Sequence, residues 1–304
     1  MNDVLPQLED LRPLLPGIGT ASCIFLLALW CHRSTNRQAL CKVALWSIPA
    51  AVFVTWWNVY GEFPWPPRQS TERALWLILI APMISLVIPQ SILRGSHFSS
   101  IIGFAAITGP IYYLLRPLIE TTADSRIAAK ELLLFVLVVL FVTAIFAEIN
   151  RTKGKALLVF GMGLSMVSMA QVFVIYGIAS LAQLLGSAGA ALLVLSPLFL
   201  FLDLESLFAK MIFPIVMLTS LFTLDAISFG DSTPPLWSLA TILGLPTLAL
   251  LEPALARTPM PTWMRRVAIM GCMVALMAWT VQGVFNSKPV EEPNPYSDYE
   301  DWDK

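Results

Sequence analysis

Asp225 is the residue in this sequence whose surroundings most favour a chemical role. The residues on both sides of it are apolar, Ser228 lies three positions later, and no Lys or Arg occurs between Lys210 and Arg257. A carboxyl group in such a segment is costly to keep in lipid, and residues of this kind usually bind a substrate or an ion. On a helix, Ser228 would share the face of Asp225. We therefore expect Asp225 to act as a counter-charge for a solute or as a proton site.

Four other polar residues are expected at the same depth in the membrane as Asp225. Asn58, Gln171 and Gln282 each fall in the outer half of an apolar segment, and Tyr176 ends one of these segments. Most of the Trp and Tyr residues also lie on this outer side. Together these groups predict an outward-facing cavity for a small polar, cationic or amphipathic ligand. The alternative is that they form an aromatic belt and hydrogen bonds between helices.

The elements that position these residues must be membrane helices. The chain is 57% hydrophobic and only 13% charged, against about 25% charged in an ordinary soluble domain. Residues 156–202 contain no Asp, Glu, Lys, Arg or His. As one helix this run would extend roughly 70 Å, whereas the hydrocarbon core of a bilayer is about 30 Å thick. It must therefore cross twice, and a turn is expected between Gly177 and Gly186, where Ser180, Gln183 and the glycines interrupt it.

Apolar segments of similar length recur along the whole chain. Backbone groups in lipid must be hydrogen-bonded within the segment, so segments this long are helices and not barrel strands. The sequence predicts an all-α, polytopic transmembrane helix bundle in residues 1–286, followed by an acidic, disordered tail in residues 287–304. We expect about ten spans, at approximately Pro13–Trp30, Val43–Tyr60, Ala74–Leu93, Phe98–Leu115, Leu132–Asn150, Ala156–Gly177, Leu184–Leu202, Met211–Phe229, Leu236–Leu251 and Val267–Asn286.

Several of these spans contain proline or closely spaced small residues. Proline removes a backbone donor and kinks a helix, which frees carbonyl groups that can bind a solute in transporters. Plain bending of the helices is the alternative. Small residues four apart, such as Gly161 with Ser165 and Gly186 with Ala190, predict close packing of the sixth and seventh spans. The prolines inside spans are Pro49, Pro82, Pro89, Pro110, Pro197, Pro214 and Pro246.

The distribution of Lys and Arg between loops predicts the orientation of the protein. More of them fall in the loops that face the cytoplasm when both termini are outside, so we expect both termini outside the cytoplasm, in the plasma (inner) membrane. Most acidic residues near spans then lie at cytoplasmic helix ends, where interfacial ion pairs are expected. Glu252, close in sequence to Arg257, is one of them.

These features favour a secondary transporter or permease for a small solute. The alternative is a non-catalytic membrane subunit or scaffold, which would bind protein partners through its membrane faces or through residues 287–304. An enzyme is not expected, because the outer loops hold no recognisable carboxylate pair and no histidine lies in a span. We expect the lipid bilayer as a partner but no nucleic acid, since the net charge is −1. No cofactor or metal site is predicted, because the spacing of Cys31, His32, Cys41 and His97 matches no common zinc pattern.

Overall fold

The computed structural model describes six helical stretches of the bundle together with some isolated residues. Asp225, Ser228 and the 287–304 tail beyond Ser287 lie outside this described part, as do half of the residues of the predicted first span and most residues of the predicted fourth, fifth and eighth spans. The residues described are 15–20, 22–23, 26, 46–63, 65–87, 109, 113, 155–197, 215, 219, 221–223 and 234–287.

The described residues form helices and no strands, which confirms the all-helical prediction for this part of the chain. Their ends agree with the predicted spans to within a few residues at most positions. The elements are α3 (Ser47–Tyr60), α4 (Ser70–Val87), α7 (Lys155–Ile175), α8 (Ala179–Leu195), α11 (Leu236–Gly244), the 3-10 helix η3 (Leu245–Leu250), α12 (Leu251–Leu255) and α13 (Thr262–Ser287).

Within the described part of the chain, three helical segments are long and apolar enough to cross a membrane: Ala156–Ile175, Trp237–Leu255 and Thr262–Ser287. The apolar helix Ala179–Leu195 is slightly shorter. Leu, Ala, Met and Val dominate these segments, and a helix bonds all of their backbone groups internally, as a bilayer requires. A helical membrane bundle is therefore supported by the described residues.

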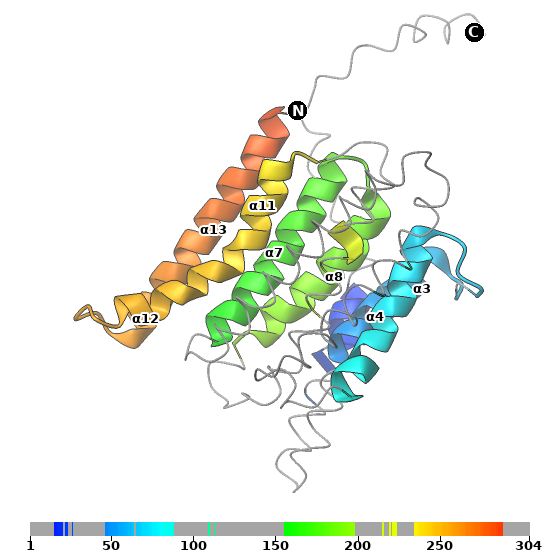
Figure 1. Cartoon of the computed structure of the whole chain (residues 1–304), viewed down its shortest axis with the longest axis horizontal. Coiled ribbons are helices and arrows are strands. Elements are labelled where there is room, and N and C mark those ends of the chain that lie inside the picture. The colour runs from blue at the N-terminus through cyan, green and yellow to red at the C-terminus, as the bar shows by residue number, and fades with distance from the viewer. Residues whose placement is uncertain are drawn as a thin grey trace, which may run out of the picture.

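Helix α7 lies at the centre of the described bundle (Figure 1), between α8 on one side and α11 and α13 on the other. In its most apolar stretch 72% of the residues are buried, against 22% in α13. On the far side of α8, α3 joins the bundle where Ala51 packs on Ala191, both fully buried. Helix α4 packs against α3. A central helix without a charged residue after Lys155 thus contacts protein on most of its surface.

The turn between α7 and α8 is shorter than the sequence predicted. Gly177 adopts a left-handed conformation with φ of 76°, and the Ile178 N–H donates to the Phe173 carbonyl oxygen, as in a glycine-capped helix end. Helix α8 begins at Ala179, so Ser180 and Gln183 are helical residues and do not form the turn. The expectation that these residues interrupt the helix was wrong, because one glycine with positive φ reverses the chain within three residues.

Candidate functional site

The relative directions of the helices follow from three contacts. A Cβ at Gly161 would lie 2.9 Å from Pro246 Cα, and the Ser165 hydroxyl donates to the Ile242 carbonyl oxygen at 2.7 Å, so α7 runs antiparallel to α11 and η3. The ring of Trp237, at the start of α11, contacts Gly283 near the C-terminal end of α13. Helix α13 is therefore also antiparallel to α11, and it runs parallel to α7.

Gln171 and Gln282 lie at a similar height in the bundle. The methyl carbon of Met273 lies 3.3 Å from the position of a Cβ at Gly161, which aligns these two residues along the parallel helices α7 and α13. Gln171 and Gln282 follow ten and nine residues later, or about 14 Å further along each helix. Both side chains are exposed. The shared height agrees with the expected geometry, while a cavity lined by both amides stays a prediction.

Asn58 and Tyr176 occupy the ends of two other elements. The Asn58 side-chain nitrogen donates to the Val54 carbonyl oxygen at 2.7 Å, within its own helix α3. Asn58 is exposed, so its side-chain oxygen remains accessible. Tyr176 is half-buried in the turn after α7 and packs against the core.

The chain that precedes Asp225 contacts α7 close to Gln171. Thr223 is buried, donates to the Thr219 carbonyl oxygen at 2.7 Å and lies 4.0 Å from the Met169 sulfur. Thr223 is two positions before Asp225, and Met169 is two positions before Gln171. Asp225 and Ser228 themselves lie outside the described residues.

Aromatic side chains gather where α3 connects to α4. Trp56 stacks on Tyr60 with ring centroids 4.1 Å apart, and the Phe63 ring meets Trp76 edge-on at 4.8 Å. Trp65 is 74% exposed, although its ring lies 5.3 Å from that of Trp76. Large amphipathic rings of this kind concentrate at membrane–water interfaces. Aromatic side chains of this kind thus concentrate at the connected ends of α3 and α4.

A proline breaks the regular helix between α11 and α12. Pro246 has no N–H with which to bond the Ile242 carbonyl oxygen four residues earlier. That oxygen instead accepts the N–H of Leu245 and the hydroxyl of Ser165, and the chain continues as the 3-10 helix η3. Ser165 is buried, and Gly161 lets α7 approach the proline closely. Sequence reasoning selected Gly161 and Ser165 as a packing face, but it missed their partners, Pro246 on η3 and Ile242 on α11.

The other small-residue contact joins α7 to α8, as the sequence predicted for these spans. A Cβ at Gly189 would lie 2.7 Å from Met166 Cβ and 2.8 Å from the Gly163 carbonyl oxygen. The two backbones therefore touch at Gly163 and Gly189. The predicted Gly161 and Ser165 pair packs against η3 and α11 instead, so the two faces of α7 use different small residues.

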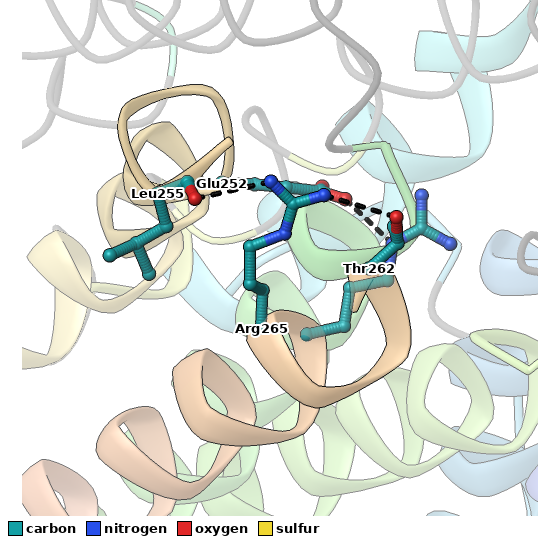
Figure 2. A network of polar contacts seen from close by, with 5 residues as sticks. Glu252, Leu255, Thr262 and Arg265 are labelled. Carbon is teal, nitrogen blue, oxygen red and sulfur yellow. Dashed lines mark hydrogen bonds and ion pairs between the residues drawn. The ribbon is translucent and has the colours of Figure 1, made fainter. Parts of the chain in front are cut away.

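Glu252 forms the interfacial ion pair that its position predicted, but with a different partner. Its Oε1 accepts the Arg266 Nε–H at 2.7 Å across the turn between α12 and α13. Figure 2 shows that Arg265 lies beside this pair, where its guanidinium donates to the Leu255 carbonyl oxygen and the Thr262 hydroxyl. The Glu252 side chain is 9% exposed. Pro259 and Pro261 lie where the chain reverses between α12 and α13. These two prolines could have indicated that the partner of Glu252 lies on the following helix.

Comparison with known proteins found no family model, no curated protein and no solved structure that matches this chain.

Proposed function

We propose that this chain is an integral membrane protein with about ten helical spans that works as a secondary transporter or permease for a small solute. In this proposal residues 1–286 form the membrane domain, which sits in the plasma membrane with both termini outside the cytoplasm. The transporter hypothesis rests on the organisation of the bundle core. The membrane assignment rests on the long apolar helices of the chain.

The observation that carries the transporter proposal is the broken segment α11–η3–α12. Transporters often place their solute and ion sites at discontinuous helices, and a broken helix can change shape more easily than a regular one. Here the break is packed against the buried central helix by Gly161 and Ser165. A simple anchor would have no need of such a contact.

Asp225 is the proposed coupling residue, and Ser228, Gln171, Asn58, Gln282 and Tyr176 are the proposed ligand contacts. Gln171 and Gln282 support this assignment through their similar height on α7 and α13. The Trp237 and Trp279 rings, whose centroids are 6.2 Å apart, lie on the same end of the bundle as Gln282. An exposed amide on the same end of the bundle as two tryptophans suits a polar or cationic solute.

The direct test is proton-coupled flux in liposomes that contain the purified protein. Entrapped pyranine would report the internal pH while amino acids, sugars and amines are added one at a time. We expect one class of solute to change the internal pH with the intact protein and not with Asp225→Asn. If Asp225→Asn transports that solute with the same pH response, Asp225 is not the coupling residue. If no solute acts with either protein, the transporter proposal fails.

The exposed face of α13 favours a second candidate, a non-catalytic subunit or scaffold of a larger membrane complex. Only 22% of its most apolar stretch is buried, and Trp279, Gln282 and Phe285 are exposed. An amide that faces lipid is costly, whereas an amide that faces another membrane helix can form a hydrogen bond. A partner helix on this face would therefore satisfy Gln282.

Purification in mild detergent, followed by size and mass analysis, distinguishes the two candidates. A subunit would bring stoichiometric partner chains with it, and removal of residues 287–304 would release any partner that docks on the tail. A transporter would be recovered as a single kind of chain, and its flux would survive the removal of the tail. If a partner helix bonds Gln282 on α13, the matched variant Gln282→Leu should weaken the co-purification of that partner.

A further inference from the structure

Large apolar side chains in the turn between α12 and α13, and on the helical residues that flank it, are not covered by protein. Trp263 is 65% exposed and Val267 60%. Met260, Met264, Leu250 and Leu251 are exposed as well. We call these six residues, together with Arg257, Arg265 and Arg266, the turn surface. Because Trp237–Leu255 and Thr262–Ser287 are both long enough to span a membrane, their connection lies at a membrane surface.

The charge of the turn surface is positive. Between Leu250 and Val267 the basic residues are Arg257, Arg265 and Arg266, and the only acidic residue is Glu252. Glu252 is buried and already paired with Arg266, so its carboxylate does not neutralise another arginine of the turn surface. The pair therefore leaves the other two arginines without a compensating acid in this stretch.

The three arginines differ in how much of their hydrogen-bonding capacity the protein uses. Arg265 bonds the Leu255 carbonyl oxygen and Thr262, as Figure 2 shows, and so holds the turn together. Arg266 uses its Nε–H for Glu252, and 28% of its side chain is exposed. Arg257 is exposed in the turn itself. Arg257 and Arg266 can therefore offer N–H groups to an external anion, and a guanidinium binds a phosphate group with two parallel hydrogen bonds.

We propose that the turn surface binds the headgroups of anionic phospholipids. Trp263 and its apolar neighbours would lie at the boundary of the acyl chains, where tryptophan is enriched. Arg257 and Arg266 would contact the lipid phosphates, and the excess positive charge would favour anionic over zwitterionic headgroups. This proposal needs only that the two helices cross a membrane, and it holds for a transporter and for a subunit alike.

The test is native mass spectrometry of the full-length, delipidated protein during titration with phosphatidylglycerol or phosphatidylcholine. We expect tighter binding of phosphatidylglycerol, and we expect Arg257→Gln to reduce this preference about fivefold, since a basic residue near an anionic membrane surface contributes about a factor of that size. The matched control is Arg68→Gln, which removes an exposed charge from the α3–α4 connection. The control should keep the preference.

An equal loss in both variants would contradict the proposal, because the effect would then follow net charge and not this surface. An unchanged preference in Arg257→Gln would contradict it as well. A second measurement needs no variant: the preference of the intact protein should fall as salt rises, because salt screens exposed charges. A preference that does not depend on salt would overturn the electrostatic basis of the site.

Discussion

Ser165 links two helices through one hydroxyl group. It donates to the Ile242 carbonyl oxygen, which Pro246 cannot bond. We predict that Ser165→Ala lowers the free energy of unfolding in detergent by about 1 kcal/mol, the usual net value of such a bond. Thermal unfolding followed by tryptophan fluorescence would measure the change.

Ser168 is the matched control for this prediction. It is buried in the same helix, but its hydroxyl donates to the Leu164 carbonyl oxygen within α7. That carbonyl is not freed by a proline, so Ser168→Ala should change stability much less. If the two variants lose the same free energy of unfolding, the bond to Ile242 stabilises the protein no more than the bond within α7 does. The cost of Ser165→Ala should also shrink in a Pro246→Ala background, where a backbone N–H is restored.

The Glu252 and Arg266 pair also acts at the scale of single residues. Arg266→Gln would leave a buried carboxylate without its cation, and we predict a loss of about 2 kcal/mol, reduced from a fully buried pair because Arg266 is partly exposed. Thermal unfolding of the variants is the measurement. The double variant Glu252→Gln with Arg266→Gln should recover part of the loss, and Arg257→Gln should be near neutral. A neutral Arg266→Gln would show that the pair does not stabilise the turn.

At the scale of helices, the contact of α7 with α8 depends on glycine. An added Cβ at Gly189 would meet backbone atoms of α7, such as the Gly163 carbonyl oxygen at 2.8 Å. We predict that Gly189→Ala destabilises the bundle by about 1–3 kcal/mol, because the helices must move apart. Lower yield and lower thermal stability after solubilisation would report the loss.

Gly271 provides the comparison for Gly189. It lies inside α13, and a Cβ there would have no heavy atom within 4 Å. Gly271→Ala should therefore be neutral or stabilise by up to about 1 kcal/mol through helix propensity. A loss of stability in Gly271→Ala as large as that in Gly189→Ala would indicate that the exposed face of α13 is occupied by a partner.

At the scale of the whole molecule, the bundle predicts which connections share a side of the membrane. The α3–α4 connection and the turn after α12 lie at opposite ends of the described bundle in Figure 1. In a background without native cysteines, we predict that a membrane-impermeant maleimide labels Arg68→Cys on intact cells. Thr258→Cys should be labelled only after the cells are opened. The reverse pattern would invert the proposed orientation, and labelling of both variants would contradict the crossing of the helices between them.

The predicted ligand residues show how far sequence reasoning reaches at a site. It selected Gln171 and Gln282 as polar residues of one outer level, which stays a prediction, although the two lie at a similar height on the parallel helices α7 and α13. It did not identify Arg266 as the partner of Glu252 or Ile242 as the partner of Ser165. Both contacts join residues on different helices, so they depend on which helices are neighbours and how each is rotated.

The sequence by itself determined that the described chain is helical and suited to a membrane. Long apolar segments without charge can satisfy their backbone groups in lipid only as helices, so residues such as 156–175 allow no other structure. The tertiary structure decided that α7 is central, that Gly161 packs on η3 while Ser165 bonds α11, and that the turn after Ile175 is short. A membrane helix is apolar on all of its faces, so the sequence pattern does not set how the helix is rotated about its axis. Close packing between particular side chains sets that rotation.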